Sequence, residues 1–128
     1  MVMSDTMALS QRGPLKDAIG SLSGYGWTAR LLGHYARDRG VLSLAEAVNR
    51  ITVRPAERLG LTDRGRLRVG AFADLAVFDA NAVNERSSVR APLSHPAGFV
   101  HVMVNGWLVV RDGERNDAQP GRVLRPAR

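Results

Sequence analysis

The hydrophobic period of the sequence changes at Gly60, and this change limits the possible folds more than any other feature. Before Gly60, apolar residues recur every three or four positions, which is the spacing of an amphipathic helix. After Gly60, apolar residues form short runs separated by turn residues, which is the pattern of strands. Helices followed by strands are typical of an α+β fold.

The first predicted helix follows a long loop. Residues 6–26 are rich in glycine and serine, so we expect the backbone to turn there without a long element. Trp27, Leu31 and Tyr35 then recur at four-residue spacing. This spacing predicts an amphipathic helix that ends at Gly40.

Two further helices are predicted before Gly60. Ser43 and Glu46 form an S-x-x-E capping box, in which each side chain accepts a hydrogen bond from the other residue's backbone N–H. This box predicts a helix that runs to Ile51. Pro55 suits the first position of a third helix, because the N–H group that it lacks has no partner there, and Gly60 is expected to end that helix.

A β-hairpin is predicted near the end of the chain. Valines alternate with other residues over 100–104, and residues 107–110 form a second apolar run. Asn105 and Gly106 stand between the two runs, and both residue types tolerate the positive φ of a type I′ turn. Asp112-Gly113 marks the next turn.

An earlier strand is predicted over residues 73–78, and its apolar run indicates that it is mostly buried. We expect Asp74 to bind backbone N–H groups of the turn at Gly70. Residues 81–98 contain two prolines and form a long connection. A sheet this small has exposed edges that need a partner.

The composition fits a single soluble domain. The chain has 128 residues and no cysteine, which excludes disulfides and thiolate chemistry. No apolar run reaches the roughly 18 residues of a membrane-spanning helix, and the N-terminus lacks the pattern of a signal peptide. We therefore expect a cytoplasmic protein without a membrane partner.

The positive charge raises the question of nucleic-acid binding. The net charge is +6, from 18 basic and 12 acidic side chains. The basic residues are scattered from Arg12 to Arg128, and aromatic residues make up only 5% of the chain. Scattered charge with few stacking side chains argues against a nucleic-acid interface. A basic nucleic-acid-binding domain is the weakest of the functional hypotheses.

The histidines do not form a recognisable metal motif. His34, His95 and His101 are far apart in the sequence, without an H-x-H or H-E-x-x-H pattern. We expect His34 to be half-buried on a helix, His95 to lie in a loop and His101 to face solvent. Asp5, Ser94 and His95 would make only a split Ser-His-Asp triad, and the G-x-S-x-G elbow is absent. The isolated chain is not expected to bind a metal or cofactor.

One long stretch carries a family resemblance. LSLAEAVNRITVRPAERLGLTDRGRLRVGAFADLAVFD combines a capped helix, a Pro-Ala helix start, a Gly-Leu stop and a G-x-L-x-x-G-x-x-A-D-L strand entry. With VMSD before it and VHVMVNGWLVVRDG after it, this stretch resembles the C-terminal part of the amidohydrolase superfamily. The branch that it resembles is the N-acyl-D-amino-acid deacylases, or D-aminoacylases.

The resemblance implies an architecture and an activity. Such enzymes have a metal-dependent (β/α)₈ barrel and a small β-sandwich built from both chain ends. The implied fold is an α+β fragment: residues 1–60 hold the last barrel strand, the substrate loop and the final helices, and residues 61–128 hold part of the sandwich. The implied function is hydrolysis of a non-peptide C–N amide bond in N-acyl-D-amino acids, with zinc or another divalent metal in the full-length enzyme.

The resemblance also implies site residues. Asp5 closes the last barrel strand beside the metal site, so it is implied both as a metal-site residue and as the group that takes a proton from the metal-bound water and delivers it to the leaving amine. The family often has a Pro-His-Pro-Arg stretch after this aspartate, whose arginine holds the substrate carboxylate. The loop here differs, and Lys16 or Arg12 is the residue expected to bind the substrate carboxylate instead.

An isolated chain of this kind is expected to be inactive, because the family's histidines belong to earlier barrel strands. The alternative hypothesis is a non-catalytic remnant or subunit that pairs with a separately encoded barrel half. Self-association through the open sheet is a further form of this alternative.

Overall fold

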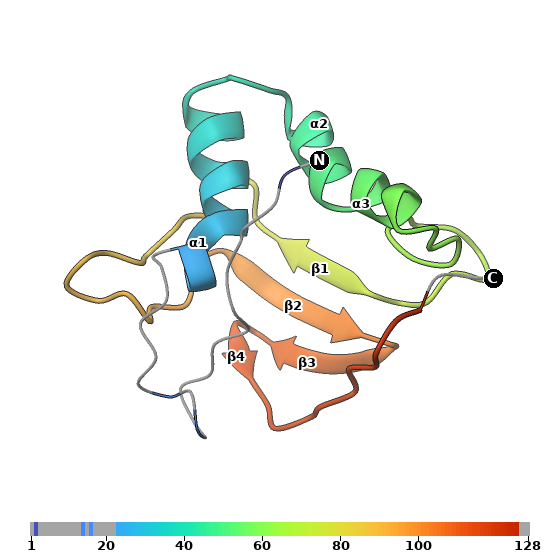
Figure 1. Cartoon of the computed structure of the whole chain (residues 1–128). Coiled ribbons are helices and arrows are strands. Elements are labelled where there is room, and N and C mark those ends of the chain that lie inside the picture. The colour runs from blue at the N-terminus through green and yellow to red at the C-terminus, as the bar shows by residue number, and fades with distance from the viewer. Residues whose placement is uncertain (1, 3–13, 15, 17–22, 126–128) are drawn as a thin grey trace.

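The computed structural model describes residues 2, 14, 16 and 23–125, which form a small α+β structure (Figure 1). The four strands form one antiparallel sheet in the order β1-β2-β3-β4, and the helices gather on the β1 side of that sheet. The α+β class predicted from the sequence is confirmed. The elements are α1 Ser23–Ala29, η1 Arg30–Asp38, α2 Leu44–Ile51, α3 Val53–Arg58, β1 Leu75–Phe78, β2 Phe99–Val104, β3 Trp107–Arg111 and β4 Glu114–Arg115.

The first helical segment starts earlier than predicted. Helix α1 begins at Ser23, so the prediction of a loop to residue 26 is wrong for its last residues. Gly26 is helical and lies against Glu85, whose Cγ would be 2.7 Å from a Cβ at this position. The glycine therefore permits a close contact and does not mark a turn. The helix continues as the π-helical η1, and the chain leaves it at Gly40, which has a φ of +57°, as predicted.

Helix α2 begins where the capping box predicts. The backbone N–H of Glu46 donates to Ser43 Oγ at 3.1 Å. The Glu46 carboxylate, however, pairs with Arg50 and Arg54 at 2.8 and 2.9 Å. The hydrogen bond from Arg50 lowers the pKa of Glu46 below its usual value.

Helix α3 differs from the prediction at its start. It begins at Val53, so Pro55 occupies the third helical position and not the first. Proline is tolerated there because N–H groups of the first turn have no intrahelical partner.

The predicted hairpin is confirmed. Asn105 and Gly106 have φ values of +50° and +81°, and Val104 pairs with Trp107 across the turn. These are the positive φ values that a type I′ turn requires. The Asp112-Gly113 pair makes a second turn with two positive φ values, which leads into β4.

Strand β1 is less buried than predicted. It is exposed at Ala76 and Val77, and Val77 is 51% exposed. Among the described residues, only one side of the sheet packs against the helical core, to which Phe78 and Phe99 contribute. The opposite side, with Leu75 and Val77, borders an open pocket of about 400 Å³.

The core joins the helices to the connection between β1 and β2. Val83 is fully buried and belongs to the same apolar cluster as Leu31 and Leu32. Its carbonyl accepts a hydrogen bond of 2.7 Å from Arg37 Nη1. Gly33 lies directly on this carbonyl, and a Cβ there would overlap the oxygen.

Gly33→Ala is expected to lower the free energy of unfolding by about 1–3 kcal/mol, the usual cost of overpacking a rigid core. The Val83 carbonyl is backbone and is already bonded to Arg37, so it has little freedom to move. Urea denaturation followed by circular dichroism measures the change. Gly121→Ala is the matched control, because, apart from its own chain neighbours, no described residue has an atom within 4 Å of the position that its Cβ would take. Equal stability of the two variants would contradict this packing.

Candidate functional site

The sequence-predicted site residues fall at the N-terminal end of the chain. Asp5 and Arg12 lie outside the described residues. Lys16 is described and exposed. The structure therefore gives no distance between these three side chains.

Val2 fixes where this end of the chain meets the helices. Its backbone N–H donates to the carbonyl of Arg50 at 3.3 Å. Its side chain is half-buried against the apolar cluster that contains Ala47. Val2 is therefore docked beside the last turn of α2.

A polar cluster joins helices α1 and η1 to the connection between β1 and β2. Arg30 Nη1 and Glu85 Oε2 form an ion pair of 2.8 Å, and the hydrogen bond that Arg30 donates to Glu85 raises the pKa of Arg30. The ring of Tyr25 meets His95 edge-on, with 5.0 Å between centroids. The buried Tyr25 Oη has no hydrogen-bond partner among the described residues. This cluster holds the connection against the helices.

The histidines lie largely where the sequence placed them. His34 is half-buried on η1, and His95 is exposed in a loop. His101 is on the open side of the sheet, where its Nδ1 accepts a hydrogen bond of 3.3 Å from the N–H of Asp112. Within residues 2, 14, 16 and 23–125, no three His, Cys, Asp or Glu side chains are grouped to hold a metal ion.

A buried arginine that sequence reasoning missed organises the sheet. Arg64 is 8% exposed, and its Nη1 donates to Asp74 Oδ2 while its Nη2 donates to Asn105 Oδ1. Its guanidinium lies 4.2 Å from the centroid of Phe72. Nothing in the local T-D-R-G pattern distinguishes this arginine from an exposed one.

Asp74 does not bind the turn at Gly70, so the prediction of its hydrogen-bond partner is wrong. Its Oδ1 accepts a hydrogen bond of 2.7 Å from the backbone N–H of Asn105 and not from the turn at Gly70. The Asp74 carboxylate is thus shared between Arg64 and the hairpin turn. The pairing of β1 with β2 places the Asn105 turn close to Asp74, so the carboxylate binds this turn although it is distant in sequence.

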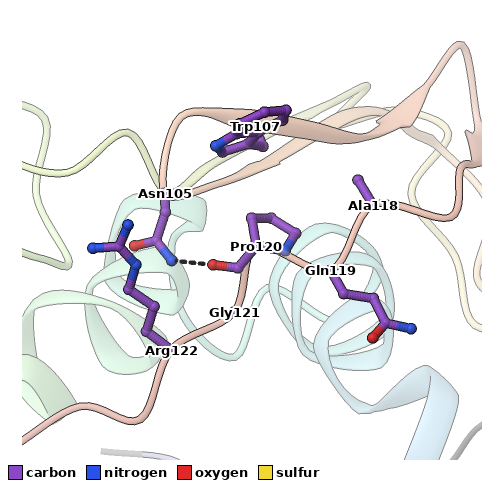
Figure 2. A pocket seen from close by; sticks show the side chains of 7 residues that line it. All are labelled: Asn105, Trp107, Ala118, Gln119, Pro120, Gly121 and Arg122. Atoms are coloured by element: carbon purple, nitrogen blue, oxygen red, sulfur yellow. Dashed lines mark hydrogen bonds between the residues drawn. The ribbon is translucent and has the colours of Figure 1, made fainter.

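A pocket of about 420 Å³ lies beside the hairpin turn, and Figure 2 shows the residues that line it. Asn105 Nδ2 donates to the Pro120 carbonyl at 2.6 Å, which holds the C-terminal segment against the turn. Trp107, which is 65% exposed, lines the pocket, as do Gln119 and Arg122. The described residues that line the pocket include no carboxylate or imidazole, so they offer no group for acid-base catalysis.

Comparison with known proteins identifies the family. A model of the amidohydrolase family matches residues 2–110. The chain belongs to the amidohydrolase family. This amidohydrolase chain is 46% identical over 101 residues to an N-acyl-D-glutamate deacylase from Alcaligenes xylosoxydans xylosoxydans, and the match covers 79% of this chain and 20% of the relative. It is 42% identical over 100 residues to a D-aminoacylase from the same organism, and this match covers 78% of this chain and 21% of the relative.

Solved structures agree with the sequence relatives. A D-aminoacylase crystal structure superimposes with a TM-score of 0.80 at 37% identity, over 83% of this chain and 22% of that one. An N-acyl-D-glutamate deacylase from Bordetella bronchiseptica, complexed with zinc and a phosphonate inhibitor, superimposes with a TM-score of 0.71 at 35% identity. The match covers 79% of this chain and 22% of that one.

The chain spans about a fifth of the length of these relatives. No helix in the described part of this amidohydrolase chain has the length and apolarity needed to cross a membrane.

Proposed function

We propose that this chain is the C-terminal part of a metal-dependent hydrolase that cleaves the amide bond of N-acyl-D-amino acids. The observation that carries the proposal is the superposition on a D-aminoacylase with a TM-score of 0.80 at 37% identity. Sequence relatives named for N-acyl-D-glutamate, D-amino-acid and N-acyl-D-aspartate substrates support the same class of reaction. They share a D-configured amino acid and differ in its side chain.

Asp5 is the proposed proton carrier. A carboxylate at the end of a barrel strand would take a proton from the attacking water and deliver it to the leaving amine, which is general acid-base catalysis. Lys16 or Arg12 would bind the substrate carboxylate. Lysine would bind it as a point charge, whereas arginine would form a bidentate pair of hydrogen bonds with it.

A metal would have to be held mainly by residues outside the described part of this chain. One related structure is described by its binuclear metal centre and another contains zinc. The described residues of this chain do not fit such a centre, because no three potential ligands are grouped among them. Asp5 is the residue of this chain that we propose to lie at the metal site.

The proposed division of the chain places residues 1–60 in the barrel and residues 61–128 in a β-sandwich. The open side of the sheet supports the second assignment, since a sandwich needs a second sheet on that side. Leu75, Met103 and Leu108 line that side and would contact the second sheet.

The test combines this chain with the part of a relative that the match does not cover. We define the deacylase remainder as the Alcaligenes N-acyl-D-glutamate deacylase without the fifth that matches this chain. The chain alone, with zinc, is expected to leave N-acyl-D-glutamate intact, whereas co-expression with the deacylase remainder is expected to give hydrolysis of the D enantiomer. Release of glutamate is the measurement. Turnover by the 128 residues alone would contradict the proposal.

A further inference from the structure

Two neighbouring apolar side chains between α3 and β1 are almost fully exposed. Leu67 is 85% exposed and Val69 is 103% exposed. Single exposed apolar residues are common, whereas contiguous exposed apolar surface marks interaction sites. We call this pair the Leu67 patch.

The arginines that flank Leu67 leave the patch uncovered. An arginine can lay its methylene groups over a neighbouring apolar side chain. Here Arg66 Nη2 pairs with Glu57 Oε1 at 3.3 Å, and Arg68 Nη2 donates to the Thr62 carbonyl at 2.6 Å. Both side chains are therefore directed back onto the protein.

The residues just before the patch are fixed against the protein. Gly65 has a φ of +74°, and a Cβ there would come within 2.7 Å of the Thr52 carbonyl oxygen and 2.8 Å of Ala56 Cβ. The backbone thus lies directly on α3. Arg64, the preceding residue, is buried and bonded to the hairpin. A surface that is already ordered loses little conformational entropy on binding.

Charge argues against a second copy as the occupant. Each chain carries a net charge of +6, so two copies repel each other, and the patch is bordered by Arg66 and Arg68. An apolar surface with acidic residues at its rim is complementary to this patch. In the relatives this fold is joined to a remainder of about four-fifths of their length.

We propose that the Leu67 patch is a second contact, separate from the open side of the sheet, through which this chain packs against the remaining part of an amidohydrolase, on an apolar surface rimmed by acidic residues. The identity of the partner rests on the proposed function. The place of the contact rests on the exposure of Leu67 and Val69 and on the rigid segment beneath them.

Thiol labelling tests the contact directly, because the chain has no cysteine of its own. Leu67→Cys places one thiol in the patch, and Val89→Cys is the matched control, since Val89 is 86% exposed in the connection between β1 and β2. In the free chain both thiols are expected to react with a maleimide at similar rates. In the complex with the deacylase remainder, labelling at position 67 is expected to slow by about tenfold or more, as at the core of an interface, and labelling at position 89 to stay unchanged.

The outcomes separate the interface from the function. Equal labelling of both thiols in the complex, or the absence of a complex, would overturn the proposed contact. Protection of position 67 in the chain alone, rising with its concentration, would show that a second copy occupies the patch and would also overturn it. Protection of position 67 in a complex that does not hydrolyse the substrate would support the contact and contradict the proposed function. Hydrolysis by a complex in which position 67 is not protected would support the proposed function and contradict the contact.

A charge variant gives a second readout. Leu67→Asp is expected to weaken binding of the deacylase remainder by tenfold or more, or about 1.4 kcal/mol, and Val89→Asp is expected to leave it unchanged. The circular dichroism spectrum and unfolding midpoint of each free variant should match those of the original chain, because both side chains already face solvent. Undiminished binding by Leu67→Asp would overturn the proposal.

Discussion

Asp5→Asn is expected to lower kcat by about 10²–10⁴-fold in the enzyme assembled from this chain and the deacylase remainder, the range that a positioned acid-base group contributes. Asparagine keeps the size of the side chain but does not accept a proton. KM is expected to change much less than kcat, because the substrate carboxylate is assigned to Lys16 or Arg12. Steady-state kinetics with N-acyl-D-glutamate measures both constants.

The control for this prediction is Asp38→Asn, which removes an exposed carboxylate paired with its neighbour Arg37. Its kcat should equal that of the unchanged chain. Assembly with the deacylase remainder must be the same for Asp5→Asn, so that a loss of rate is not a loss of complex. An unchanged kcat in the Asp5→Asn enzyme would show that Asp5 is not the proton carrier.

Arg64→Ala is expected to lower the free energy of unfolding by about 1–3 kcal/mol, because it removes charge-assisted hydrogen bonds made by a nearly buried guanidinium while Asp74 stays in contact with water. The Asp74 carboxylate would lose its charged partner, and the Asn105 side chain would lose one of its two hydrogen bonds. Phe72 would also lose the guanidinium beside its ring. Since small domains are stable by only about 5–15 kcal/mol, the variant should unfold at markedly lower urea concentration.

Arg66→Ala is the matched control for Arg64→Ala. Arg66 pairs with Glu57 at 3.3 Å on the surface, where an ion pair contributes about 0–1 kcal/mol. The double variant Arg64→Met/Asp74→Leu separates pairing from packing, because replacing both partners by apolar side chains leaves no unpaired charge. It should recover only part of the lost stability, because the Asn105 N–H loses its hydrogen bond to Asp74. Equal effects of Arg64→Ala and Arg66→Ala would show that the Arg64 contacts do not hold the sheet.

The elements set by adjacent residues could be predicted from the sequence. The hairpin follows from two residues that accept positive φ, and the start of α2 follows from the Ser43 hydroxyl three residues before an N–H donor. The wrong predictions concern residues whose partners are distant in sequence. Gly26 faces Glu85 and Asp74 binds Asn105, and neither contact leaves a local pattern.

The candidate site was predictable only through family resemblance. Asp5, Arg12 and Lys16 are ordinary residues in a stretch rich in polar side chains, and no spacing among them indicates a catalytic or metal site. The family assignment itself was predictable, because the stretch from Ser43 to Asp79 carries a specific order of capped helix, stop and strand entry. The burial of Arg64 could not be predicted from the sequence, since it depends on how the hairpin packs.

A chimeric enzyme decides whether this chain can serve in a working deacylase. In the Alcaligenes N-acyl-D-glutamate deacylase, the matching fifth is replaced by the 128 residues of this chain, and hydrolysis of N-acyl-D-glutamate and of its L enantiomer is measured with zinc present. We predict turnover of the D enantiomer alone, and its loss when Asp5 is changed to Asn. A folded, zinc-loaded chimera that hydrolyses neither enantiomer would contradict the proposed function.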